Sequence, residues 1–314
     1  MAALLSLRDV HVRFDTAAGT VRAVNGVSLD LAVGETLGLV GESGCGKSTL
    51  GKAIMKLVSV AGGEIFVEGV DIAPLKGREL TDMRRKVQMI FQDPYGSLNP
   101  RSSVGRSVGQ PLALAGWKDD AIRERVDTLL RWVGLPPEAK QRFPHEFSGG
   151  QRQRIGIARA LALSPRLIIC DEPVSALDVS VRAQVINLLE DLKAEFGVSY
   201  LFISHDLSVV EHIADRVAVM YLGTIVEAGG RDQIWRSPQH PYTKALLEAA
   251  PIANPKAARA RQRTVLQGEL PSPLNPPAGC PFNSRCPIAQ ERCRVERPLL
   301  RPVGNGAQAA CHFV

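Results

Sequence analysis

The chain has 314 residues, 45% of them hydrophobic, which is enough for one main domain with an appendage. No stretch approaches 18 consecutive apolar residues and the N-terminal segment lacks a signal-peptide pattern, so we expect a soluble, cytosolic protein. The net charge of +6 resides in the segment from Pro251 onward, which carries nine Lys and Arg against three Glu, while residues 1–250 are balanced. The charge of the main domain therefore gives no indication of nucleic-acid binding.

A change in composition marks a domain boundary. Residues 251–314 contain 10 of the 21 prolines and four of the six cysteines. We therefore expect a main domain over residues 1–250 and a Pro- and Cys-rich C-terminal extension over residues 251–314.

A phosphate-binding loop is predicted early in the chain, after two alternating strands around residues 10–14 and 27–31. An apolar strand at residues 36–40 precedes the loop and a helix pattern follows it, so backbone N–H groups can converge on an anion at a helix start. Lys47 would supply charge to the outer phosphates and Ser48 could reach Mg²⁺. The loop consists of Gly41, Glu42, Ser43, Gly44, Cys45, Gly46, Lys47, Ser48 and Thr49.

Three later strands are each followed by polar side chains. Gln92 follows an apolar segment, Asp171 and Glu172 follow the apolar run 167–170, and His205 follows the run 198–203. Because ligand sites in α/β sheets form at the carboxyl ends of strands, we expect these side chains beside the phosphates. Asp171 would hold Mg²⁺, and Glu172 would orient or activate water.

A mostly helical segment separates the first and second of these strands. Helical spacing over residues 121–133 ends at a Gly-Leu-Pro-Pro stop. Ser148 then stands at the N-cap of an apolar helix, and Gly149 and Gly150 leave its first N–H groups open. Taken alone, such a turn is more often an ordinary capped helix, but the loop upstream favours a second anion-binding helix start.

In order and spacing, these motifs resemble the nucleotide-binding domain of ABC transporters over residues 1 to about 250. The resemblance implies a P-loop α/β fold with a RecA-like core, an antiparallel β subdomain, and a helical subdomain at about residues 93–165. The matching elements are the Walker A loop at 41–49, the Q-loop Gln92, the signature Ser148-Gly149-Gly150-Gln151, the Walker B strand at 167–172, the D-loop ending at Asp178, and the switch histidine His205.

Further stretches of the sequence indicate which group of ABC transporters the chain resembles. Residues 236–247 and the Pro/Cys segment after them are similar to the extension of ATPase subunits from the oligopeptide/dipeptide importer group, and residues 91–101 resemble its "F" subunit. This resemblance implies ATP hydrolysis that powers import of di- and oligopeptides at the cytoplasmic face of the membrane. The implied partners are a second, related ATPase subunit, two separate transmembrane permease subunits and, indirectly, a solute-binding protein.

Three alternatives remain open for the transported solute or the role of the chain. Nickel, glutathione and oligosaccharide importers share this type of ATPase. A soluble ABC ATPase acting on nucleic acid or ribosomes usually carries two cassettes or a long coiled coil, and neither is evident here. The third alternative is a regulatory protein whose C-terminal extension senses redox state.

The family mechanism implies roles for individual residues. Ser48, Gln92 and Asp171 would hold Mg²⁺, and Glu172 and His205 would hold the attacking water. Each triphosphate would lie between one subunit's Lys47 loop and the signature of its partner. Two departures are visible: Phe147 replaces the usual Leu that opens the signature, and no tyrosine stands where adenine normally stacks, for which Phe14 is the substitute we predict.

Four cysteines cluster in the extension, whereas Cys45 and Cys170 lie within motifs and are expected to be small buried residues. In a cytosolic protein such a cluster favours a metal site over disulfides. Its spacing lacks Cys-x-x-Cys pairs, and its Cys-Pro dipeptides are compatible with iron–sulfur ligation; zinc and free thiols remain open. The resembled group implies a [4Fe–4S] cluster on Cys280, Cys286, Cys293 and Cys311.

Overall fold

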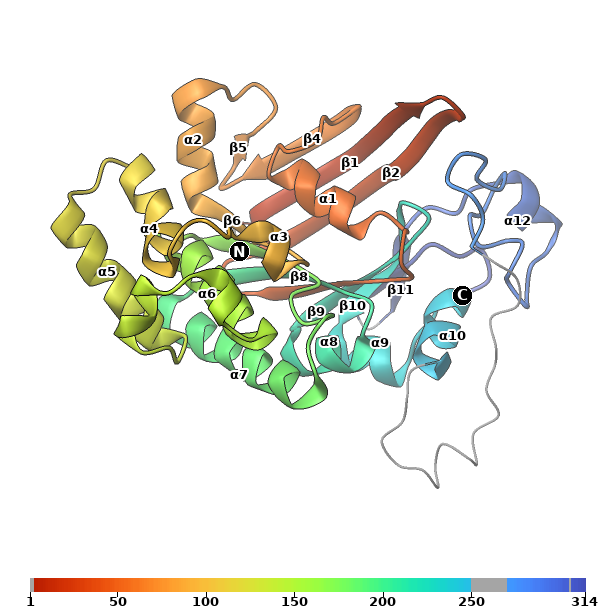
Figure 1. Ribbon diagram of the computed structural model, residues 1–314. Coiled ribbons are helices and arrows are strands. Elements are labelled where there is room, and N and C mark those ends of the chain that lie inside the picture. Colours follow the sequence, from red (N-terminus) through yellow and green to blue (C-terminus); the bar gives the residue numbers. More distant parts are fainter. Residues whose placement is uncertain (1–2, 250–269, 305) are drawn as a thin grey trace.

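The computed structural model describes residues 3–249, 270–304 and 306–314. Its smaller sheet is antiparallel and has the strand order β2-β1-β4-β5 (Figure 1). Alternating apolar residues bury one face of these strands, as in the pattern of β1. The strands are β1 (Ala3–Thr16), β2 (Gly19–Ala32), β4 (Gly62–Val67) and β5 (Val70–Asp71).

The larger sheet has eight strands in the order β11-β12-β10-β9-β3-β8-β7-β6. Its centre is parallel, and every residue of β3, β7 and β8 is buried, which explains their continuous apolar sequences. The strands are β3 (Thr36–Val40), β6 (Val87–Ile90), β7 (Leu167–Asp171), β8 (Ser199–Ser204), β9 (Arg216–Tyr221), β10 (Thr224–Gly230), β11 (Arg301–Gly304) and β12 (Ala307–Ala309).

Helix α1 (Lys47–Ile54) lies between the two sheets (Figure 1). One hydrophobic core contains Leu50 and Ile54 of α1 together with apolar residues of both sheets. The start of α1 is thereby fixed at the carboxyl end of β3, where the predicted phosphate loop connects the two elements.

A helical region extends to one side of the larger sheet, between β6 and β7 in sequence (Figure 1). It consists of α3 (Pro94–Ser97), α4 (Val104–Leu114), α5 (Asp119–Trp132), two 3-10 turns (Pro137–Gln141 and Pro144–Glu146) and α6 (Gly149–Leu161). The remaining helices are α2 (Gly77–Lys86), α7 (Val179–Phe196), α8 (Leu207–Ile213), α9 (Arg231–Arg236), α10 (Pro241–Ala249) and α12 (Glu291–Val295).

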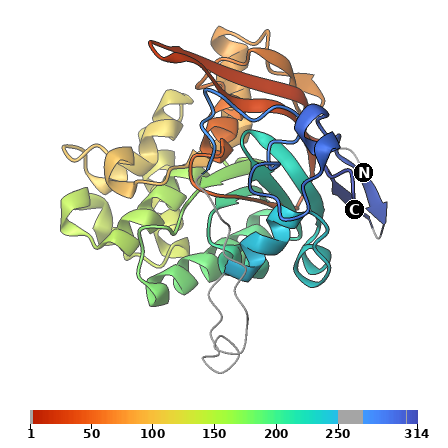
Figure 2. The ribbon, with the colours of Figure 1, turned by 90° about the vertical axis from the view of Figure 1, so that its right-hand side faces the viewer.

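The part of the extension that the structure describes packs onto the main sheet. Strand β12 pairs with β10 through Glu227 opposite Ala309, and β11 pairs with β12. Figure 2 shows these strands and α12 at one side of the molecule, beside β10. The boundary expected at residues 250 and 251 lies outside the described residues.

Among the helices of residues 3–249, 270–304 and 306–314, none combines the length and the apolar character needed to span a membrane.

Candidate active site

The predicted phosphate loop leaves β3 and enters α1 with several backbone positions that only glycine tolerates. Gly46 has a φ of 109°, and a Cβ there would lie 2.1 Å from the carbonyl oxygen of Ala23. A Cβ on Gly41 would lie 2.2 Å from the carbonyl oxygen of Met220. The loop is therefore closely packed against β2 and β9 and takes the shape that leaves N–H groups free to bind an anion.

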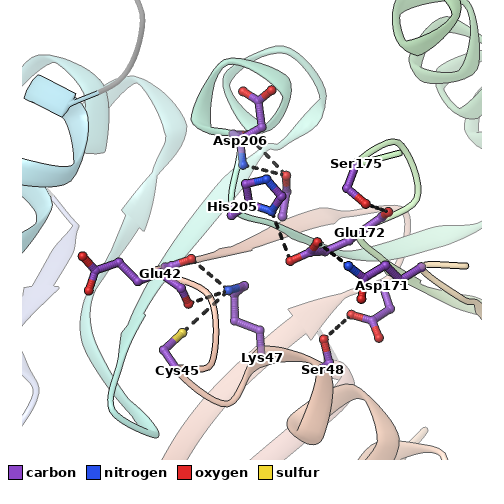
Figure 3. Close-up of polar contacts among 12 residues, drawn as sticks. Glu42, Cys45, Lys47, Ser48, Asp171, Glu172, Ser175, His205 and Asp206 are labelled. Carbon is purple, nitrogen blue, oxygen red and sulfur yellow. Dashed lines mark hydrogen bonds and ion pairs between the residues drawn. The ribbon is translucent and has the colours of Figure 1, made fainter. Parts of the chain in front are cut away.

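Lys47 is buried within this loop, with 3% of the residue exposed. Its Nζ donates hydrogen bonds to the carbonyl oxygens of Gly41 at 2.8 Å and Glu42 at 2.9 Å (Figure 3). Cys45 is buried beside it, as the sequence predicts, and burial raises the pKa of its thiol. The ammonium group is thus held at the mouth of the loop, where it can contact outer phosphates.

Ser48 and Asp171 join the phosphate loop to the end of β7. The Ser48 hydroxyl donates to Oδ1 of Asp171 at 2.6 Å (Figure 3). Burial raises the pKa of the Asp171 carboxyl, so the site favours a neutralising cation. Hydroxyl and carboxylate oxygens are ligands that Mg²⁺ prefers, and this donor set therefore fits the ion.

Glu172 stands at the centre of the remaining polar contacts. Its Oε2 accepts from Nε2 of Gln92 at 3.0 Å, and its Oε1 lies 3.2 Å from Nδ1 of His205 (Figure 3). The backbone of Glu172 has a φ of 47°, an unfavourable conformation for a non-glycine residue that is characteristic of functional sites. The structure therefore brings Gln92 and His205, which follow two other strands, to the carboxylate of Glu172, as the sequence predicts.

The signature residues form the capped helix start that the sequence predicts. Ser148 Oγ accepts from the N–H of Gln151 at 3.3 Å, and Gln151 Oε1 accepts from the N–H of Ser148 at 3.0 Å. Gly150 packs under Val181, since a Cβ there would lie 2.3 Å from that side chain. Ser148 and Asp178 are exposed, so this helix start is open to a ligand or partner from outside the subunit.

The structure also places Phe147 and Phe14, the two residues at which the sequence departs from the family pattern. Phe147 is buried in the core, so the departure from Leu preserves an apolar side chain. Phe14 lies on β1 opposite Val21 with 39% exposed, and its stacking on adenine stays a prediction.

Two residues that the sequence analysis did not identify contact the phosphate loop. The Tyr242 hydroxyl of α10 accepts from the N–H of Glu42 at 2.9 Å. Arg285 of the extension forms an ion pair with the carboxylate of Glu42. Arg285 lies between Cys280 and Cys286 in the sequence, and no spacing rule links that position to the loop.

The iron–sulfur prediction is not supported. Cys280, Cys286, Cys293 and Cys311 line one small pocket, and none of the four forms a disulfide. Burial raises the pKa of Cys280 to about 11. In the part of the chain that the structure describes, no group of three or more His, Cys, Asp or Glu side chains is placed to hold a metal ion.

Two family models match the chain. Residues 24–175 match the model of the ABC transporter family, and residues 226–293 match that of the oligopeptide/dipeptide transporter C-terminal region. Together they include the phosphate loop, the signature and three of the four clustered cysteines.

Curated relatives match along nearly the full length. A probable peptide ABC transporter ATP-binding protein of Sinorhizobium fredii is 56% identical over 95% of this chain and 84% of its own. The oligopeptide transport ATP-binding protein OppF of Salmonella typhimurium is 53% identical over 95% of this chain and 92% of its own.

Solved structures confirm the expected P-loop α/β fold. A dimeric ATP-binding cassette in a post-hydrolysis state bound to ADP and Pi aligns with a TM-score of 0.67 and 28% identity, covering 72% of this chain and 98% of its own. CbiO1 of Clostridium perfringens, part of an ABC transporter complex, aligns with a TM-score of 0.68 and 26% identity over 76% of this chain and 92% of its own. The chain belongs to the ATP-binding proteins of ABC transporters, in the oligopeptide/dipeptide group.

Proposed function

We propose that this chain is the ATPase subunit that powers import of di- and oligopeptides through separate transmembrane permease subunits. The observation that carries the ATPase role is the convergence of Gln92 and His205 on Glu172, beside the Ser48–Asp171 hydrogen bond. The names of the relatives support the peptide substrate, since they are described as peptide or oligopeptide transport proteins.

The roles of the site residues follow from their contacts. Glu172, between the Gln92 amide and the His205 ring, is placed to accept a proton from attacking water, and His205 orients that carboxylate. Lys47 and the loop N–H groups hold the phosphates of ATP. Ser48, Asp171 and Gln92 would hold Mg²⁺, which supplies charge neutralisation at the phosphates when it is bound.

The exposed signature accounts for the proposed pairing with a second subunit. The N-cap residue Ser148 is exposed, and Gly149 and Gly150 form the first turn of α6, whose N–H groups point out of the helix start. In a sandwich of two related ATPase subunits, each signature would contact the phosphates on its partner's loop, so ATP would close the pair. Gln92 and the helical region after it would pass this closure to permease subunits at the cytoplasmic face of the membrane, with a solute-binding protein acting indirectly.

Peptide uptake in cells whose only copy carries Glu172→Gln tests this proposal. The variant is expected to bind ATP, stop hydrolysis and abolish uptake of labelled di- and oligopeptides. Glu190→Gln is the matched control, because Glu190 also pairs with a histidine, His212, at 3.3 Å but lies on α7 away from the loop. Normal peptide uptake by the Glu172→Gln cells would refute the motor role or the substrate class, and the ATPase rate of the purified variant distinguishes the two.

A further inference from the structure

The extension contacts the phosphate loop through a bidentate ion pair. Nη1 of Arg285 lies 2.7 Å from Oε2 of Glu42, and Nη2 lies 3.0 Å from Oε1. The Arg285 side chain is 6% exposed and that of Glu42 is 27% exposed, so solvent screens the pair only partly. Paired N–H···O bonds of this kind fix orientation as well as distance.

Aromatic rings hold the guanidinium in place. The ring of Tyr221, at the end of β9, lies 5.9 Å from the guanidinium carbon of Arg285. Phe282, three residues before Arg285, packs edge-on against Tyr221 at 5.3 Å and against Tyr242 at 5.5 Å. The hydrogen bonds to Glu42 raise the pKa of Arg285, which keeps its charge fixed.

Glu42 is held at its backbone as well as its side chain. Its N–H donates to the Tyr242 hydroxyl at 2.9 Å, and its carbonyl accepts from Lys47 Nζ at 2.9 Å. The residue that Arg285 binds is therefore also one that positions the phosphate-binding lysine. A shift of Glu42 would move the loop and the Lys47 ammonium together.

The phosphate loop is costly to order, so contacts that hold it in place favour ATP binding. Gly44 and Gly46 have positive φ values, and a glycine-rich segment loses much conformational entropy when it is ordered. Contacts that order the loop before ATP arrives reduce the free-energy cost of binding.

We infer that Arg285 is a positioning residue, which holds the phosphate loop in its ATP-binding shape through Glu42 and makes nucleotide affinity depend on the C-terminal extension. This inference rests on the proposed ATPase function. Arg285 acts on ATP only through Glu42 and Lys47, so its loss raises the KM for ATP and leaves the rate at saturating ATP largely unchanged.

The test measures KM and kcat of the full-length protein with Mg·ATP. Arg285→Ala is expected to raise KM about tenfold with kcat within about twofold, and Glu42→Gln is expected to raise KM by a similar factor. Arg292→Ala is the matched control, because Arg292 forms a bidentate pair with Glu296 at 2.7 and 3.0 Å in the same extension, on exposed side chains. Its KM is expected to equal that of the wild type.

A reciprocal exchange provides the rescue. The double variant Arg285→Glu with Glu42→Arg restores the pair and is expected to recover most of the wild-type KM. Should Arg285→Ala fail to fold, Glu42→Gln carries the same test, since it leaves every residue of the extension in place.

Three results would overturn the inference. An unchanged KM in folded Arg285→Ala, with only a lower unfolding temperature, would show that the pair merely anchors the extension. A raised KM in Arg285→Ala but not in Glu42→Gln would show that the arginine only neutralises charge. Wild-type protein that binds no ATP would overturn both this inference and the proposed function, whereas the first two results leave the proposed function intact.

Discussion

The Ser48 hydroxyl donates a 2.6 Å hydrogen bond to the Asp171 carboxylate and so connects the start of α1 to the end of β7. The two residues are 123 positions apart in the chain, and the central parallel strands bring them together. Burial raises the pKa of Asp171, and the hydrogen bond from Ser48 offsets part of that effect; a cation bound beside the carboxylate would offset more of it.

Asp171→Asn is expected to stabilise the nucleotide-free protein while abolishing hydrolysis of Mg·ATP. The folded pKa of Asp171 is raised, so the unfolded chain releases this proton first and wild-type stability falls as the pH rises above about 3.9 toward the raised pKa. Asparagine removes that penalty, and the gain in unfolding temperature should be largest near neutral pH and shrink toward pH 4. Thermal unfolding without nucleotide measures it, and a wild type that is the more stable protein near neutral pH would contradict it.

His205→Ala is expected to lower kcat about 100-fold with a small change in KM. The His205 ring lies 3.2 Å from Glu172 and would orient the carboxylate that handles water, while the phosphates are held elsewhere, by the Lys47 loop. Steady-state kinetics with Mg·ATP measures both constants. His212→Ala removes another histidine–glutamate pair and should leave them unchanged; a parallel rise in KM for His205→Ala would contradict the assignment.

Gly46→Ala is expected to prevent ATP binding and lower the unfolding temperature sharply. A Cβ at this position meets the Ala23 carbonyl oxygen at 2.1 Å, so β2 or the loop must move. Gly44→Ala is the comparison, because its φ of 79° is also positive but no atom lies within 4 Å of the added Cβ. That variant should lose only about 1 kcal/mol of stability. Equal losses in the two variants would show that backbone strain, rather than the close approach of β2, dominates.

The buried His240 is expected to make the protein less stable in acid. Burial lowers the pKa of this ring to about 3, and its Nδ1 accepts a hydrogen bond from the N–H of Tyr242, which needs an unprotonated nitrogen. The unfolded chain takes up this proton near pH 6.5, so the free energy of unfolding falls between pH 6.5 and 3 by up to about 1.4 kcal/mol per pH unit.

His240→Asn, which retains an acceptor, should flatten that dependence. Exposed His145→Gln should retain it. Urea unfolding between pH 7 and 4.5 gives the slope, and an identical slope in wild type and His240→Asn would assign the acid loss to other groups.

Much of the fold followed from periodicity. The continuous apolar run at 167–170 predicted a buried parallel strand, and β7 is buried throughout. Strand ends then predicted the convergence of Gln92 and Glu172, because parallel strands place their carboxyl ends at one edge. Helix α2 (Gly77–Lys86) was not predicted, because charged residues dominate its sequence and Met83 is its only buried residue among those described.

The contacts of the extension could not be predicted from the sequence. Arg285 lies 243 residues from Glu42, and an ion pair between such distant positions has no local pattern. The same holds for Tyr242, whose place in α10 indicates burial but not that its hydroxyl reaches the loop. The cysteine spacing, in turn, suggested a metal site that the arrangement of the described thiols does not support.

The pairing of β12 with β10 has a consequence for biosynthesis. Strand β10 would form the open edge of the larger sheet without Ala307–Ala309, and an unpaired edge with apolar residues such as Ile225 and Val226 can recruit strands from other chains. The protecting residues emerge from the ribosome after the first 300 have been made, so the nascent cassette carries an exposed edge until then. Chains shortened before Arg301 would retain that edge permanently and should aggregate even with an intact active site.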